Sequence, residues 1–241
     1  YAIIGPNGAG KTTLFNCING IYPPTDGQIF FRGKNIRGLS PDRVAKAGIA
    51  RTFQNIELFS NMNTMENLML GRHLFMKTGL FRGGFLWGRN SFAGKEEIKN
   101  RKRVEEIIDL LELQPFRNKL VGALPYGIQK KIELGRALAA EPELLLLDEP
   151  CAGMNAEEKQ DVVFWIKDIQ DELGITILLI EHDMTMVMDI SDRILALNFG
   201  RQIAEGTPDQ VSVHPEVLKA YLGAEEEEGD HSQILENRKK A

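Results

Sequence analysis

Cysteine and histidine are both scarce in this chain. Its 241 residues include two cysteines and four histidines. The cysteines, Cys17 and Cys151, stand far apart and form no metal-binding spacing, which is typical of reduced thiols in a cytosolic protein. The histidines are scattered along the chain, so we expect no zinc cluster.

Long apolar runs and an excess of positive charge are also missing. No run of about 18 apolar residues could span a bilayer, and no secretory signal is seen. The net charge of −5 argues against nucleic acid as the main partner. Hydrophobic residues make up 43% and charged residues 26%, as in ordinary soluble proteins. The length allows one large domain or a core with an inserted subdomain.

A glycine-rich run near the start is the most informative feature. It reads Gly5-Pro6-Asn7-Gly8-Ala9-Gly10-Lys11-Thr12, followed by Thr13, and fits the phosphate-binding pattern G-x-x-x-x-G-K-[ST]. We expect a strand before it and a helix over 12–19 after it. Backbone N–H groups would then form an anion site at a helix N-terminus, with Lys11 on the terminal phosphates and Thr12 on Mg²⁺. The alternative is a glycine-rich turn before an ordinary helix; the closing Gly-Lys-Thr favours nucleoside triphosphate binding.

The first half of the chain changes pattern near residue 53. Before it, strand-like runs such as 28–31 alternate with turns, and residues 54–140 are largely helical. One apolar helix face is formed by Val104, Ile107, Ile108 and Leu111. The segment 74–94 mixes aromatic and basic residues with glycines. It indicates either an exposed surface for a membrane partner or lipid headgroups, or, as we slightly favour, a loop that packs on the helical part.

The second half returns to alternating strands and helices. The apolar runs 144–147 and 175–180 are typical of central parallel strands, with a crossover helix between them. Residues 194–197 and 201–204 predict a closing hairpin. From 223 onwards, charged residues indicate a solvated, mostly disordered tail. Because the chain opens within a strand and without Met, we also expect a segment upstream of it.

Two acids directly follow the apolar run 144–147. Asp148 and Glu149 would stand at the carboxyl edge of a parallel sheet, where ligands bind in such folds. Asp148 offers Mg²⁺ an oxygen ligand, directly or through water. Glu149 can orient and deprotonate an attacking water. The alternative is an acid pair that caps the next helix.

Two further polar residues complete a predicted catalytic site. His182 follows the run 175–180, and it would lie beside the phosphate loop because adjacent parallel strands end at one edge. There it could hydrogen-bond the γ-phosphate and steady Glu149, although a lone histidine is usually structural. Gln54, at the start of the helical part, offers a donor and an acceptor suited to water or Mg²⁺.

In their order and spacing, these motifs resemble those of the ATP-binding cassette (ABC) ATPases, over nearly the whole chain. Four further runs are similar to the ATP-binding subunits of branched-chain amino acid importers: 52–59, 152–155, 180–184 and 215–223. The resemblance implies an α/β fold, with a P-loop NTPase core whose mostly parallel sheet is flanked by helices, and an inserted helical subdomain. The implied divisions are a core of 1–55 and 141–222, a helical subdomain of 56–140 and a tail of 223–241.

The resemblance also implies how such a subunit works. It would bind and hydrolyse ATP with Mg²⁺ at the cytoplasmic face of the cell membrane, as a peripheral subunit. Two such subunits would pair head to tail and close on ATP, driving two transmembrane permease subunits. A solute-binding protein outside the membrane would deliver the amino acid.

The family's signature loop, usually Leu-Ser-Gly-Gly-Gln, falls on residues 124–128. The resemblance makes Tyr126 and Gly127 contacts of the γ-phosphate held by the opposite subunit. Pro125 replaces the serine whose hydroxyl would bind that phosphate, which favours a heterodimer with an intact partner over a homodimer. The family's adenine-stacking aromatic would lie upstream of this sequence, and Tyr1 is a poor substitute for it.

Other functions are compatible with parts of this pattern. An ABC ATPase of another solute or lipid transporter would share every motif, and Pro125 is compatible with a weakly hydrolysing regulatory cassette. ATPases of this type that act on DNA need long coiled coils, which are missing here. A GTP switch needs Asn-Lys-x-Asp, and residues 118–121 lack its aspartate.

An apolar strip follows Gln54. It comprises Phe59, Met62, Met65 and Leu68. Methionine adapts to varied partners, so we hypothesise that residues 54–70 dock a permease helix. The alternative, above all for Leu68, is packing within the helical subdomain.

Overall fold

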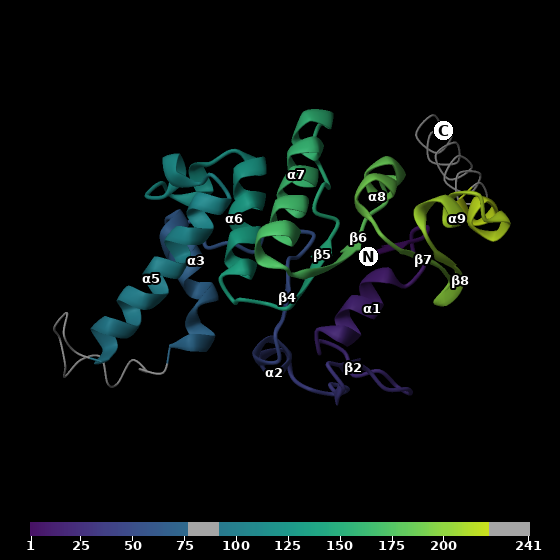
Figure 1. The fold of residues 1–241 in the computed structure, drawn as a ribbon, viewed down its shortest axis with the longest axis horizontal. Coiled ribbons are helices and arrows are strands. Elements are labelled where there is room, and N and C mark those ends of the chain that lie inside the picture. Colours follow the sequence, from purple (N-terminus) through teal and green to yellow (C-terminus); the bar gives the residue numbers. More distant parts are fainter. Residues whose placement is uncertain (77–91, 222–241) are drawn as a thin grey trace, which may run out of the picture.

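A computed structural model describes residues 1–76 and 92–221 of the chain, and the structural statements below concern these residues. The fold is mixed α/β (Figure 1). Its strands are β1 (Ala2–Ile4), β2 (Phe30–Phe31), β3 (Lys34–Asn35), β4 (Ile49–Arg51), β5 (Leu144–Asp148), β6 (Thr176–Ile180), β7 (Ile194–Asn198) and β8 (Arg201–Gly206). Its labelled α-helices are α1 (Lys11–Ile18), α2 (Pro41–Lys46), α3 (Thr64–Gly71), α5 (Phe92–Leu110), α6 (Tyr126–Leu138), α7 (Ala156–Leu173), α8 (Met184–Ile190) and α9 (Pro208–Ser212), and residues 215–221 are also helical.

The main sheet has six strands in the order β4-β5-β6-β1-β7-β8. All neighbours pair in parallel except β8, which closes the sheet as an antiparallel hairpin with β7. This confirms the predicted parallel sheet and hairpin. The strand predicted at 28–31 is shorter than expected: β2 holds two residues and pairs with β3 outside the main sheet.

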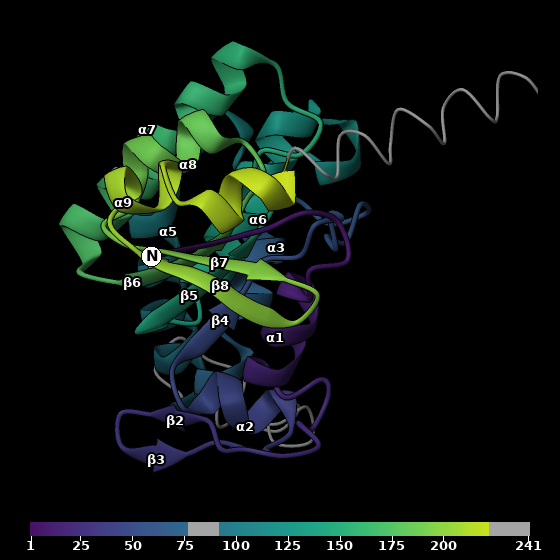
Figure 2. The ribbon, with the colours of Figure 1, turned by 90° about the vertical axis from the view of Figure 1, so that its right-hand side faces the viewer.

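Two layers of helices cover the sheet. Helices α7, α8 and α9 lie on one face, and α1 and α2 lie on the other (Figure 2). Side chains alternate between the two faces: Leu145 and Leu147 join one apolar core, and Leu146 joins the other. Both faces of the central strands are therefore buried, as their unbroken apolar sequence predicts.

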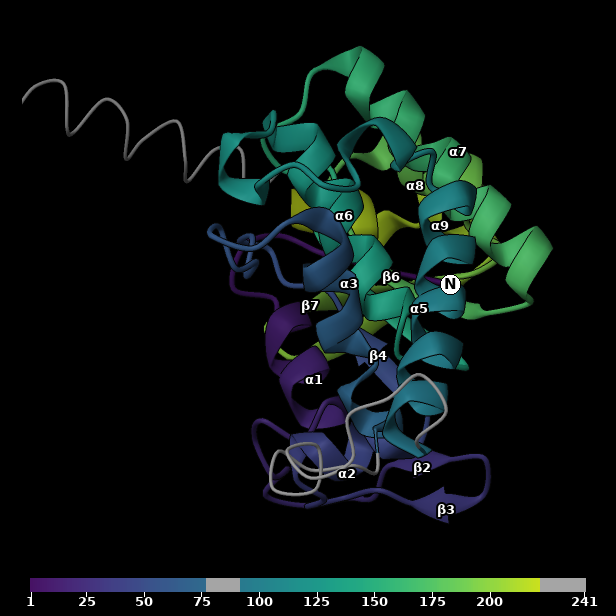
Figure 3. The ribbon, with the colours of Figure 1, turned by 90° about the vertical axis from the view of Figure 1, so that its left-hand side faces the viewer.

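Helices α3, α5 and α6 pack together beside the β4 edge of the sheet (Figure 3). The apolar face predicted between Val104 and Leu111 is buried there, which confirms it. Met65 and Leu68 are also buried, because the inner face of α3 packs against α5 and α6. The hypothesis that these two residues form a docking strip is therefore wrong, whereas Phe59 is 55% exposed.

Residues 77–91, the larger part of the aromatic and basic segment 74–94, lie outside the described residues, as does the tail from 223. Within residues 1–76 and 92–221, no helix combines the length and the apolar character needed to cross a membrane.

Candidate functional site

The glycine-rich loop runs from the carboxyl end of β1 into α1, as the motif requires. Gly10 precedes the helix with φ 96°, a conformation that favours glycine. At Gly5, with φ 149°, a β-carbon would overlap the carbonyl oxygen of Leu197 on β7. No side chain caps the N-terminus of α1, so the first backbone N–H groups of the helix are available to bind an anion.

Lys11 lies inside this loop. Its Nζ donates hydrogen bonds to the carbonyl oxygens of Gly5 at 2.6 Å and Pro6 at 3.2 Å. Burial lowers the pKa of the Lys11 ammonium, and the nearby carboxylates of Glu149 and Asp148 partly oppose this shift. Thr12 and Thr13, in the first turn of α1, are exposed.

Asp148 ends β5 and forms a buried ion pair that the sequence did not predict. A guanidinium nitrogen of Arg51, at the end of β4, lies 2.5 Å from Asp148 Oδ2, and both side chains are 4% exposed. The same guanidinium donates to Asn16 Oδ1 on α1 and contacts the rings of Phe15 and Phe53. Arg51 thus connects three elements around the predicted Mg²⁺ carboxylate.

Glu149 lies within hydrogen-bond distance of Gln54. Gln54 Nε2 donates to Glu149 Oε2 at 2.7 Å, although the two residues follow different strands. Glu149 itself has φ 48°, an uncommon value for a residue with a side chain. Its N–H donates to the carbonyl oxygen of Ile180, which holds this backbone against β6.

His182 follows β6 at the same edge of the sheet, and its side chain is 61% exposed. Its Nδ1 lies 3.7 Å from Oε2 of Glu181, whose side chain is fully buried. Glu181 also accepts hydrogen bonds from the backbone N–H groups of Cys151 and His182. A buried glutamate thus ties the segment after Glu149 to the segment that carries His182.

The signature residues form a separate group within this chain. Pro125 precedes α6, and Tyr126 and Gly127 begin it. Tyr126 Oη donates to the carbonyl oxygen of Ala152 at 3.4 Å. A β-carbon on Gly127 would lie 3.3 Å from Oε1 of Glu158. The contacts that the structure gives these residues are with the segment after Glu149, not with the glycine-rich loop.

Four residues around the site were missed as functional candidates. Glu181 directly precedes His182, and Arg51 lies just before the run 52–59. Lys130, on α6, donates to the carbonyl oxygens of Phe53 and Gln54. The fourth, Tyr221, contacts the loop from far along the chain. The available signal for Glu181 was a charged residue directly after an apolar run. β4 is too short to give such a signal for Arg51, and nothing in the sequence indicated the partners of Lys130 and Tyr221.

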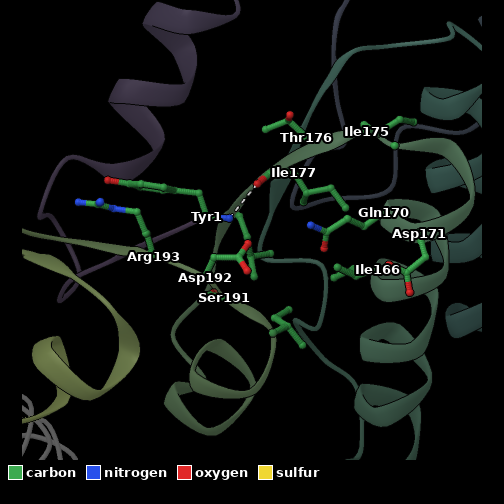
Figure 4. A pocket seen from close by; sticks show the side chains of 13 residues that line it. Tyr1, Ile166, Gln170, Asp171, Ile175, Thr176, Ile177, Ser191, Asp192 and Arg193 are labelled. Atoms are coloured by element: carbon green, nitrogen blue, oxygen red, sulfur yellow. Dashed lines mark hydrogen bonds between the residues drawn. The ribbon is translucent and has the colours of Figure 1, made fainter.

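A cavity of about 650 Å³ lies at the opposite end of the sheet (Figure 4). Gln170, Asp192 and Arg193 line it, and the backbone nitrogen of Tyr1 donates a hydrogen bond to the carbonyl oxygen of Ile177 beside it. These residues precede or begin their strands or lie on α7. The cavity is therefore at the amino edge, away from the residues of the glycine-rich loop and from Glu149.

Comparisons with known proteins agree with this geometry. A family model described as ABC transporter matches residues 1–152. A second, described as branched-chain amino acid ATP-binding cassette transporter, matches residues 201–227. Among solved structures, an ATP-binding cassette of an ABC transporter in its ADP conformation has a TM-score of 0.77 and 30% identity, over 92% of this chain and 87% of that one. A nucleotide-free cassette also has a TM-score of 0.77, with 31% identity over 91% and 86%.

Curated relatives cover almost the same span. The high-affinity branched-chain amino acid transport ATP-binding protein BraF of Pseudomonas aeruginosa is 42% identical over 222 residues, which are 92% of this chain and 86% of the relative. LivG of Escherichia coli, of the same description, is 43% identical over the same shares of the two chains. The chain therefore belongs to the ABC transporter family, as one of its ATP-binding cassettes.

Proposed function

We propose that this chain hydrolyses ATP as a subunit of an importer for branched-chain amino acids, peripheral to the cytoplasmic face of the membrane. The observation that carries the proposal is the meeting of the glycine-rich loop, Asp148, Glu149 and His182 at one edge of a parallel sheet. The solute assignment rests on relatives described as branched-chain amino acid transport proteins.

Nucleotide binding is assigned to the loop from Gly5 to Thr13. Its glycines let the backbone follow the phosphates, and the buried Lys11 ammonium can donate its third N–H to them while the other two stay on the carbonyl oxygens of Gly5 and Pro6. The hydroxyl of Thr12, the amide oxygen of Gln54 and the carboxylate of Asp148 are hard oxygen donors, and this donor set fits Mg²⁺. When bound, Mg²⁺ would neutralise charge on the phosphates.

Hydrolysis is assigned to Glu149 as the general base. The hydrogen bond from Gln54 orients the Glu149 carboxylate while leaving its other oxygen to accept a proton from water. His182 is exposed at the same edge, where its ring can hydrogen-bond the γ-phosphate. We assign it the role of steadying both the phosphate and Glu149.

The need for a second ATPase subunit is inferred from the separation, within this chain, of the signature residues from the glycine-rich loop. Tyr126 and Gly127 have their contacts away from the glycine-rich loop, so they would reach nucleotide held by another subunit in a head-to-tail pair. Pro125 supplies no hydroxyl there. A different partner subunit with an intact signature loop would leave one complete site, and a heterodimer is therefore favoured.

Permease docking is assigned to a groove between β4 and the α3–α6 pair. Its volume is about 410 Å³, and Ala50, Phe53, Phe59 and Ala137 contribute apolar lining. Gln54 follows directly after Phe53, so a permease helix in the groove would adjoin the catalytic edge. A cysteine at Phe59 should crosslink to a permease cysteine, and one at the exposed Phe164 on α7 should not.

The experiment that tests this function is solute uptake by the complete transporter. Proteoliposomes that contain the permease, both ATPase subunits and the binding protein should accumulate labelled leucine when ATP is inside. Histidine serves as the control amino acid. ATP-dependent uptake of a different solute with none of leucine, isoleucine or valine would contradict the proposal, and would favour a transporter of another solute. Leucine uptake that does not require ATP hydrolysis at this chain's own site would favour a regulatory cassette.

A further inference from the structure

The end of the described chain contacts the start of the glycine-rich loop. Residues 215–221 are helical. Val217 anchors this segment in the apolar core that also contains Leu145 and Leu147. Tyr221 packs against the same core. Its hydroxyl accepts a hydrogen bond of 2.9 Å from the backbone N–H of Gly5, a residue 216 positions earlier.

Gly5 is a sensitive point of the loop. It is the first residue after β1, and its backbone is so close to the Leu197 carbonyl oxygen that no side chain would fit. Its own carbonyl oxygen accepts the 2.6 Å hydrogen bond from Lys11 Nζ. The peptide groups on either side of Gly5 therefore link the Tyr221 hydroxyl, through Gly5, to the Lys11 ammonium.

The chemistry of Tyr221 suits a permanent anchor. Burial raises the pKa of its phenol, with the hydrogen bond from Gly5 as a smaller opposing effect, so the hydroxyl stays neutral at physiological pH. A neutral hydroxyl can accept the Gly5 N–H without adding a charge that would repel phosphate. Its aromatic ring can pack independently of the hydroxyl, which allows the two contributions to be tested apart.

We infer that Tyr221 is a positioning residue of the nucleotide site, whose hydroxyl fixes the Gly5 peptide and so holds Lys11 where it meets the phosphates of ATP. This inference rests on the proposed function, because it assumes that the loop binds ATP. In this role Tyr221 needs no contact with the nucleotide or the reacting atoms. It acts by ordering the loop before binding, which reduces the ordering that ATP must bring about.

The test compares Tyr221→Phe with Tyr22→Phe in the full-length protein. Tyr221→Phe removes the hydroxyl and keeps the ring, and Tyr22 is an exposed tyrosine that serves as the control. Loss of one neutral hydrogen bond should raise the Kd for ATP with Mg²⁺ about three- to tenfold. Amide hydrogen exchange at Gly5 should become faster in Tyr221→Phe alone. The control should match the wild type in both measurements.

A second comparison tests the route through Lys11. In a Lys11→Ala background, Tyr221→Phe should change the Kd by less than about twofold, because residues that act as a unit are not additive. The full effect persisting in that background would contradict the inference. The inference would also be contradicted if Tyr221→Phe lowered the Tm but left the Kd for ATP and the Gly5 amide exchange unchanged, because that result would show a packing role only. If the wild-type protein binds no ATP, the proposed function itself fails.

Discussion

At the scale of single residues, the pair of Arg51 and Asp148 offers the sharpest test of stability. Both side chains are buried, and Arg51 has its other contacts on α1. Replacing Arg51 by Met would leave the Asp148 carboxylate buried without its partner. We expect the free energy of unfolding to fall by about 3–5 kcal/mol, measured by urea denaturation.

The matched control is the exposed pair of Lys167 and Asp189, whose nitrogen and oxygen lie 3.1 Å apart. Lys167→Met should cost less than about 1 kcal/mol, because solvent screens surface pairs. Equal losses in Arg51→Met and Lys167→Met would show that the Arg51 pair is not a buried, tightly held one.

The two cysteines should differ in reactivity. Burial raises the pKa of Cys151 to about 12, and the neighbouring Glu181 adds to this shift. Because the thiolate is the reactive form, Cys151 should resist iodoacetamide up to about pH 10, where roughly 1% would be ionised. Cys17 is partly exposed and should be alkylated first. Peptide mass spectrometry checks this; rapid modification of Cys151 at pH 8 in the folded protein would contradict it.

The placement of several candidate residues followed from the sequence by a simple rule. Asp148, Glu149 and His182 follow apolar runs long enough for central strands, and parallel neighbours end at one edge. The partner of Asp148 could not be predicted in this way. Arg51 belongs to another strand, and pairing between strands distant in sequence depends on the order of strands in the sheet, which local patterns do not reveal.

At the scale of helices, the contact between α3 and α6 depends on glycine. A β-carbon on Gly71 would overlap the backbone carbonyl oxygen of Arg136, which cannot move without shifting α6. On Gly135 it would meet only the ends of side chains, the nearest being Leu111 Cδ1 at 3.1 Å. Gly71→Ala should therefore lower the free energy of unfolding by about 1–3 kcal/mol.

Gly135→Ala is the internal comparison. The side chains around it can adjust, and alanine gains about 1 kcal/mol of helix propensity, so the net change should be within about 1 kcal/mol. Thermal unfolding of both variants measures the two changes in the free energy of unfolding. A larger loss in Gly135→Ala than in Gly71→Ala would mean that α3 and α6 do not approach as described.

The elements that the sequence predicted poorly are short ones. β4 holds three residues, Ile49–Arg51, too few for a recognisable alternating or apolar run. The apolar residues after Gln54 were predicted to form a docking strip because local spacing does not show whether another helix covers them. Spacing along α3 shows that Met65 and Leu68 belong to an apolar face, but only the packing of α5 and α6 shows that this face is covered.

At the scale of the whole molecule, the separation of Pro125 from the glycine-rich loop predicts action on a partner subunit. Pro125→Ser would supply a hydroxyl to the partner's ATP and should speed hydrolysis there about five- to thirtyfold. ATP turnover is measured in complexes whose partner has either its intact catalytic glutamate or glutamine in its place. An equal gain in both complexes would rule out the head-to-tail arrangement.

The central claim is that Glu149 drives ATP hydrolysis at the edge of the sheet, and one measurement tests it most directly. Glu149→Gln keeps the shape of the side chain but cannot accept a proton, and Gln54 still lies beside it. The assembled transporter is prepared with the partner's glutamate changed to glutamine, so that only this site reports, and the complex that keeps Glu149 sets the reference rate. We predict that Glu149→Gln lowers ATP turnover by roughly 10²–10⁴-fold while the Kd for ATP stays within about threefold. Turnover at the reference rate in the Glu149→Gln variant would contradict the account.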